Sequence, residues 1–296
     1  MFTSLISFYL ATIIQGLPQI TMSEVKPSQF QNILTASPIP QPALPSGPDM
    51  SALNIQASAY LAVDLRSGKM LAQKNIKEQR SIGSITKLIT ALVILDEHDI
   101  NEVVKVPLAA TKTEGSKIWL AEGEKITIRN LLYGTLIHSG NDAAYALAMY
   151  DTGSLGKFVE KMNDKAKKLG LNATNFANPA GLDRDGNYST AEDIATLGAF
   201  AYRNAFIRNT VSIASTTVTS VNGQFKHELK STNELLTKDP RIKGLKTGYT
   251  LEAGKSFVSV AIIENGSPIL TVVLNSPDRF KETESLIDWT ANNFTW

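Results

Sequence analysis

The order of apolar patterns along the chain limits the fold more than any other feature of the sequence. Residues 57–65 and 70–72 flank a turn at 66–69, as in a β-hairpin. Helical spacing follows in a long block, at residues 84–96, 126–137, 142–150, 155–169 and 191–202, the last with Thr190 as N-cap. Strand-like runs then occupy 211–221, 244–246, 256–263 and 269–274, before a final helix at 280–293. Strands from both ends of the chain must share a sheet, so we expect an α+β fold. It would be a mainly antiparallel sheet flanked by helices, with an inserted all-helical lobe.

The first 49 residues differ from this pattern. Residues 2–17 are largely apolar and uncharged, a length that suits a secretory signal and is short for a membrane span. No cation precedes the run and no small-x-small cleavage site is evident, so a buried helix or a misassigned start is an open alternative. Residues 27–48 hold six prolines, as in an extended linker. We expect a signal peptide or N-terminal membrane anchor at 1–22, a proline-rich linker at 23–49 and one folded domain at 50–296.

Composition excludes several classes of function. Lys plus Arg total 29 and Asp plus Glu 28, so no basic excess points to a nucleic-acid partner. Cysteine is absent, which rules out disulfides, thiolate metal sites and a cysteine nucleophile. With three histidines in the whole chain, the sequence does not favour a histidine-rich metal centre, and we expect no cofactor or metal.

Three short motifs together supply the groups for acyl transfer. In Ser84-Ile85-Thr86-Lys87, residues three apart share a helix face, so the lysine can act as base for the serine. Ser139-Gly140-Asn141 brings a hydroxyl and an amide to a tight turn between two helices. Lys246-Thr247-Gly248 places a fixed positive charge and a hydroxyl on a strand edge, where glycine leaves room for a substrate backbone.

Each motif alone has a simpler explanation, as an N-cap, a helix break or a turn. The chain itself contains two further matches. Ser154 and Lys157 have the spacing of the first motif, but their helix is lined with lysines, so an N-cap and a solvated face are the better interpretation. Ser231-Thr232-Asn233 fits the second, but lies so close to Lys246 that it more simply serves the preceding loop.

The motifs in this order resemble those of the low-molecular-mass penicillin-binding D-alanyl-D-alanine carboxypeptidases, of the β-lactamase and transpeptidase-like fold. The resemblance extends over residues 54–296. It includes LLYGTLIHSGNDAA at 131–144, FANPAGL at 176–182, YSTAEDI at 188–194 and NSPDRF at 275–280.

The resemblance implies a role for each motif residue. Ser84 would be the nucleophile and Lys87 its general base, with a pKa lowered by the nearby Lys246 cation in a partly dry cleft. Ser139 would relay protons to the leaving D-alanine, and Asn141 would hold a substrate amide. Lys246, Thr247 and Gly248 would receive the substrate's terminal carboxylate and backbone. The oxyanion hole would consist of the backbone N–H groups of Ser84 and Tyr249.

The activity implied is removal of the terminal D-alanine from peptidoglycan stem pentapeptides, outside the bacterial cytoplasmic membrane, with β-lactams as covalent inhibitors. A D,D-endopeptidase acting on crosslinks, and a wall-binding or antibiotic-sensing module with little turnover, are the alternatives. A class A β-lactamase would need a deacylating glutamate, and residues 172–187 contain none.

The chain departs from the family pattern in three ways. Tyr249 and Asn187 stand where some members have histidine. We also expect no C-terminal β-domain or amphipathic tail, so any membrane attachment would be through the N-terminus.

Overall fold

The computed structural model describes Ala43 and residues 53–183, 186–264 and 266–296, which belong to one compact unit at 37–296. The expected signal peptide or anchor at 1–22 lies outside the described residues, as does the linker apart from Ala43. Among the described residues, no helix has both the length and the apolar character needed to cross a membrane.

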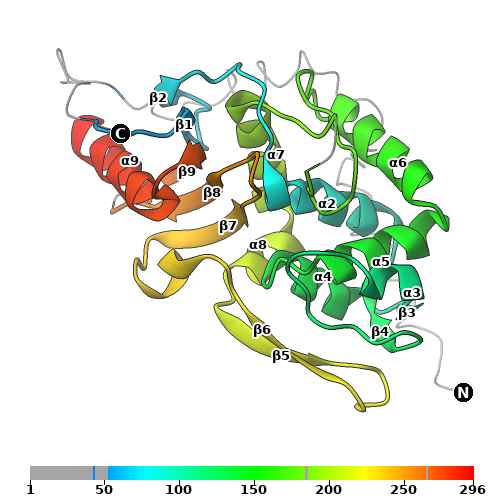
Figure 1. Cartoon of the computed structure of the whole chain (residues 1–296). Coiled ribbons are helices and arrows are strands. Elements are labelled where there is room, and N and C mark those ends of the chain that lie inside the picture. The colour runs from blue at the N-terminus through cyan, green and yellow to red at the C-terminus, as the bar shows by residue number, and fades with distance from the viewer. Residues whose placement is uncertain (1–42, 44–52, 184–185, 265) are drawn as a thin grey trace, which may run out of the picture. The chain divides into compact units, whose positions relative to one another are not determined.

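A five-stranded antiparallel sheet joins the two ends of this unit (Figure 1). Its order is β2 (Met70–Lys74), β1 (Ala59–Asp64), β9 (Pro268–Ser276), β8 (Lys255–Ile262) and β7 (Ile242–Gly248). The pairing of β1 with β9 aligns Leu61 with Val272, more than 200 residues apart in the chain. The prediction that strands from both ends share a sheet is therefore confirmed.

Alternation along the strands gives the sheet two buried faces. On β9, Ile269 and Val273 lie in one apolar cluster, with Trp289 of helix α9 (Arg279–Asn293). Leu270 and Val272 lie in the other, which continues into α2 (Lys87–Glu97) and α7 (Ala191–Arg203). Because side chains alternate across a strand with period two, one strand can serve both clusters. Both layers of helices are thus fixed to the same sheet.

Three further helices of the predicted central block are α4 (Ile128–Leu136), α5 (Asn141–Thr152) and α6 (Leu155–Lys168), and they pack together in the lobe. The helices α3 (Leu108–Thr111) and α8 (Ala205–Val211) were not predicted. Short two-stranded sheets pair β3 (Val103–Lys105) with β4 (Lys125–Thr127), and β5 (Ser215–Thr219) with β6 (Lys226–Lys230). A 3₁₀ turn, η3 (Glu234–Thr237), precedes β7.

Three predicted boundaries need correction. The helix expected at 126–137 begins at Ile128, because β4 pairs with β3 over the preceding residues and Thr127 then caps α4. The strand expected at 211–221 begins only at Ser215. The residues before it form α8, which is capped by Asn204 and includes Val211 as its last residue. The helix expected from Ser84 opens as the 3₁₀ turn η2 (Gly83–Thr86) and becomes α-helical at Lys87. Thr190 caps α7 through the N–H of Asp193, as predicted.

Candidate active site

The structure brings the serine and lysine of the first motif into contact. Ser84 lies in η2, at the N-terminus of α2, and Lys87 is the first residue of α2. The Ser84 Oγ and Lys87 Nζ atoms are 2.7 Å apart. N–H groups in a first helical turn have no acceptor within the helix, so the backbone N–H of Ser84 is available to a ligand.

Lys87 is fully buried and has no carboxylate within hydrogen-bonding distance among the described residues. Its Nζ donates to Asn141 Oδ1 and to the carbonyl oxygen of Ala180, both at 2.7 Å. Burial, followed by the charge of Lys246, holds the Lys87 pKa well below its usual value, against a smaller opposing effect of Asp142. A neutral amine donates two hydrogens and accepts one. The two oxygens take both hydrogens, which leaves the nitrogen lone pair for the Ser84 hydroxyl.

The second motif forms the turn between α4 and α5. Ser139 adopts a left-handed backbone with φ of +63°, and Asn141 begins α5. Besides its bond to Lys87, the Asn141 side chain donates to the carbonyl oxygen of Glu114 at 2.5 Å. The Asn141 backbone N–H donates to Ser116 O at 2.7 Å. The amide is thereby held between Lys87 and the loop at 113–124.

Lys246, on β7, contacts the second motif directly. Its Nζ donates to Ser139 Oγ at 2.8 Å and to Thr247 O at 3.1 Å, and the residue is 1% exposed. Burial, with a contribution from the Arg279 cation, lowers the Lys246 pKa to about 7. Burial thus opposes the fixed positive charge expected from the sequence, and among the described residues no carboxylate lies within hydrogen-bonding distance of Lys246 Nζ to offset it.

Glycines allow the end of β7 to lie directly against η2. A Cβ atom on Gly248 would be 2.3 Å from Ile82 O, and one on Gly83, at φ +53°, would be 2.9 Å from Tyr249 N. No side chain fits at either position. This contact brings the backbone of Ser84 and Tyr249 to the same edge, while the Tyr249 side chain is 59% exposed.

Three residues at the site were not predicted from the motifs. Ala180 supplies the carbonyl that binds Lys87, from a segment already quoted for its family resemblance. Arg279 donates from Nη1 to Gly248 O at 2.9 Å. Thr232 hydrogen-bonds the Thr247 hydroxyl, with 2.6 Å between the oxygens. Thr232 belongs to the second Ser-x-Asn match, assigned above to loop structure alone. No local sequence signal shows that its loop returns to β7.

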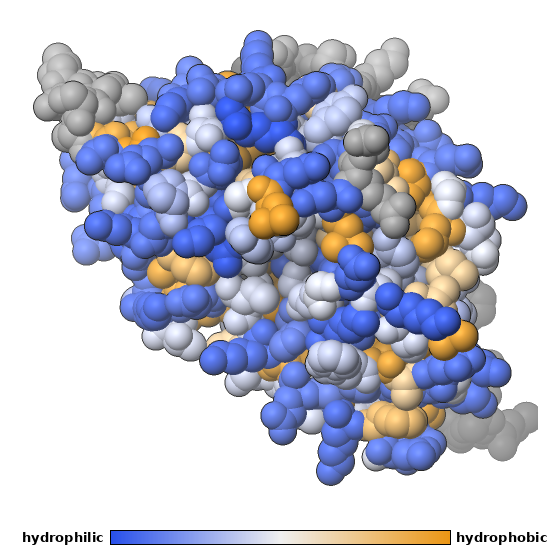
Figure 2. Space-filling view, viewed as in Figure 1, coloured by the Kyte–Doolittle hydropathy of each residue, from blue (hydrophilic) through white to orange (hydrophobic). Residues whose placement is uncertain are grey.

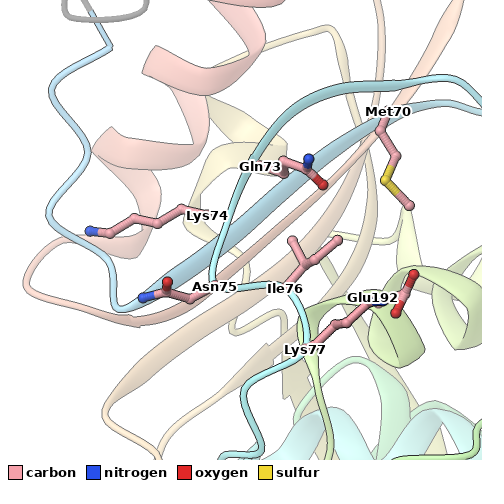
Figure 3. A pocket seen from close by; sticks show the side chains of 7 residues that line it. All are labelled: Met70, Gln73, Lys74, Asn75, Ile76, Lys77 and Glu192. Atoms are coloured by element: carbon pink, nitrogen blue, oxygen red, sulfur yellow. The ribbon is translucent and has the colours of Figure 1, made fainter.

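Other predicted or conspicuous groups lie apart from these contacts. Lys157 is exposed, and Ser154 occupies the N-cap position of α6 without a side-chain capping bond. Asn187 is buried, and its amide has no hydrogen-bond partner among the described residues. A hollow of about 610 Å³ between β2 and Glu192 of α7 contains none of the motif residues (Figure 3). Within the described part of the chain, no cluster of three or more His, Asp or Glu side chains is arranged to hold a metal.

Comparison with known proteins places this geometry in a family. The profile of the D-alanyl-D-alanine carboxypeptidases, peptidase family S11, matches residues 46–278. The chain belongs to this family. D-alanyl-D-alanine carboxypeptidase DacF of Bacillus subtilis is 36% identical over 212 residues, which cover 70% of this chain and 54% of that protein. DacB2 of Mycobacterium tuberculosis is 33% identical, with 83% of each chain covered.

The crystal structure of the Streptomyces K15 DD-transpeptidase is similar to this S11 family member, with a TM-score of 0.76 and 31% identity. The match covers 80% of this chain and 97% of the Streptomyces chain, so the predicted transpeptidase-like fold is confirmed. The chain spans 54% and 64% of the length of the first two curated relatives, from Bacillus subtilis and Escherichia coli.

Proposed function

We propose that this protein is a serine D-alanyl-D-alanine carboxypeptidase that removes the terminal D-alanine of peptidoglycan stem pentapeptides. The observation that carries the proposal is the 2.7 Å contact between Ser84 Oγ and a buried Lys87 amine with a lowered pKa. Such an amine can take the serine proton without help from histidine or metal. Family membership supports the same reaction.

In the proposed reaction, Ser84 Oγ attacks the carbonyl carbon of the D-Ala–D-Ala bond while Lys87 accepts its proton. The N–H groups of Ser84 and Tyr249 stabilise the tetrahedral oxyanion, at about 3 kcal/mol for each donor. Ser139 passes a proton to the leaving amine and receives in turn the proton that Lys87 accepted, and D-alanine departs. Water then attacks the Ser84 ester, and the proton it gives up returns through Lys87 to Ser84 Oγ. The Ser139 hydroxyl is suited to this relay because it contacts Lys246 Nζ.

The remaining motif residues would bind substrate. Asn141 would hold a peptide amide, and Lys246, Thr247 and Gly248 the terminal carboxylate and the adjoining backbone. A carboxylate beside Lys246 would raise the lysine pKa from about 7, so binding itself would secure the cation. β-Lactams present a similar carbonyl and carboxylate, and would trap Ser84 as a slowly hydrolysed ester.

The proposed substrate lies outside the cytoplasmic membrane, so the enzyme would act in the periplasm or on the wall side of that membrane. Residues 1–22 would direct export, or hold the enzyme at the membrane, and 23–49 would link them to the catalytic domain at 50–296. The apolar N-terminal run and the prolines behind it support this arrangement.

Mass spectrometry of defined muropeptides tests the proposal. Pentapeptide monomers and crosslinked dimers are incubated together with the full-length chain, with Ser84→Ala as control. Loss of one D-alanine from monomers, with dimers intact and with no change in the control, is the expected result. Cleaved dimers would make the protein an endopeptidase. Unchanged substrates beside normal penicillin acylation would make it a wall-binding or sensing module.

A further inference from the structure

Trp119 is the exposed residue whose conformation is hardest to explain as packing. Its side chain is 79% exposed, and its backbone is left-handed with φ of +64°. A bulky residue pays a steric penalty in this region, and an indole in water also gives up apolar burial. Both terms oppose this arrangement, so other contacts must hold it in place.

A buried carboxylate holds the backbone on both sides of Trp119. Asp142, 1% exposed, accepts the N–H of Ile118 at Oδ1 and that of Leu120 at Oδ2, both at 3.1 Å. The Ile118 and Leu120 side chains are themselves buried. The two neighbours are therefore anchored inward while the residue between them remains at the surface.

A second buried pair holds the same segment from another direction. His227 on β6 contacts Ile118 O through Nδ1 at 2.8 Å, and Glu124 Oε1 through Nε2 at 2.7 Å. The other Glu124 oxygen accepts the N–H of Ala121 at 3.0 Å. Both imidazole nitrogens face acceptors, so the ring donates from both as a cation. The segment is thus tied at Ile118, Leu120 and Ala121.

This anchored segment belongs to the loop that orients the candidate active site. Within residues 113–124, Glu114 O and Ser116 O accept the two hydrogen bonds from Asn141 described above. Asp142, which holds the other end of the loop, is the next residue in the chain. The indole is therefore presented by the element that positions a proposed substrate-binding side chain, and not by an unrelated surface.

We propose that the Trp119 indole is a binding platform for a sugar ring of the glycan strand that carries the stem peptide. The inference rests on the proposed peptidoglycan substrate. An exposed, conformationally fixed indole offers a flat apolar face, which matches the C–H face of a pyranose. Lys117 Nζ lies over the ring, 5.8 Å from its centroid, and donates to Thr111 O at 3.1 Å, so a cation is held on one face of the indole and the sugar would stack on the opposite face. On the face of the molecule shown in Figure 2, apolar side chains form small patches separated by polar ones.

The first experiment compares two substrates with the same stem pentapeptide, one free and one attached to its disaccharide. For Trp119→Ala, the ratio of kcat/KM for the disaccharide substrate to that for the free peptide should fall about tenfold, the loss of one stacking contact, mainly through KM. Trp119→Phe keeps a flat ring and should restore most of the ratio. An unchanged ratio would overturn the proposal, because it would mean that the indole binds peptide or nothing.

The second experiment does not require peptidase activity. Peptide-free glycan chains are titrated into the Ser84→Ala protein and tryptophan emission is recorded. A saturable change is expected, and it should be lost in Ser84→Ala/Trp119→Phe. That variant keeps two tryptophans, of which Trp289 is buried and Trp296 is half-buried at the C-terminus. No change in the first protein would refute the platform even if the wild type were an active carboxypeptidase. If glycan changes the emission of Ser84→Ala but the wild type shows no peptidase activity, the proposed reaction is refuted and the binding platform is not.

Discussion

Two clusters of buried titratable side chains, one with Lys87 and Lys246 and the other with His227 and Glu124, differ in the partners that they have for their charges. Lys87 and Lys246 have hydroxyl, amide and carbonyl oxygens as hydrogen-bond partners, and burial lowers both pKa values. His227 has a carboxylate at 2.7 Å, and its bond to Glu124 raises the histidine pKa. Similar depth therefore yields lysines that lose protons readily and a histidine that keeps one.

The difference suggests that the lysine cluster serves the reaction and that the histidine cluster stabilises the fold. A charge left without a counter-ion is costly, and titratable groups in that state are typical of reactive sites. A paired charge bonded to backbone atoms fixes a loop. We therefore expect substitutions in the lysine cluster to change rates, and substitutions in the histidine cluster to change stability.

The largest effect is expected from Lys87→Ala. Without the amine, the Ser84 hydroxyl has no base, so acylation by a fluorescent penicillin should slow by about 10²–10⁴-fold. The melting temperature should stay close to that of the wild type, because the lost hydrogen bonds are offset by removal of a buried amine that has no carboxylate partner among the described residues. Lys157→Ala, in the second Ser-x-x-Lys match, is the matched control and should acylate normally. A near-normal rate for Lys87→Ala would assign the base to another group.

Glu124→Ala tests the other side of the comparison. Removal of one partner from a buried ion pair should lower the free energy of unfolding by about 3 kcal/mol, measured by urea denaturation. The folded pKa of His227 is raised, so its stabilising contribution is complete below about pH 6.5 and is lost as pH rises through the folded value. The gap between wild type and variant should narrow at alkaline pH.

Glu124→Gln controls for this substitution, because its amide oxygen can still accept a hydrogen bond. It should lose less stability than Glu124→Ala. Equal stability of wild type and Glu124→Ala at pH 6 would show that the His227 pair does not hold the loop.

The sequence predicted the sheet and the main site because the relevant patterns are local. Helical periodicity and the Ser84–Lys87 spacing each lie within one element, and the strand patterns at the two ends leave few ways to form a sheet. The exact start of η2 was missed, but the contact between Ser84 and Lys87 was still predicted, because residues three apart meet in either helical form.

The parts not predicted depend on contacts between distant segments. Thr232 reaches Thr247 only because its loop returns to β7, and Ala180 reaches Lys87 only because Gly181 lies against Gly83. The pKa of Lys246 likewise depends on complete burial, which a triplet motif does not encode. His227 gave no signal at all, since a single histidine on a short strand has no pattern around it.

The smallest effect is expected in the pH dependence of the proposed peptidase reaction, where kcat/KM should change by about tenfold per pH unit. Above its pKa of about 7, Lys246 loses the charge that would attract the substrate carboxylate. Raising the pH favours the neutral form of Lys87, whose pKa is held well below its usual value, so only the loss of the Lys246 charge should lower kcat/KM above about pH 7, by about tenfold per unit. Bound carboxylate raises the Lys246 pKa, so kcat should stay constant to higher pH than kcat/KM.

Two controls assign this alkaline limb to Lys246. A substrate ending in an uncharged amide has no carboxylate for the Lys246 charge to attract. Its kcat/KM should therefore be low but should not fall above pH 7. Lys246→Arg stays charged across the range, and its kcat/KM for the natural terminus should remain level whatever its absolute value. A wild-type profile of kcat/KM that stays level to pH 9 would mean that Lys246 keeps its proton before substrate binds. Lys246 and His227 would then both stay protonated near neutral pH, although only His227 has a carboxylate partner. The reactivity of Ser84 would have to be attributed to the lowered pKa of Lys87 alone.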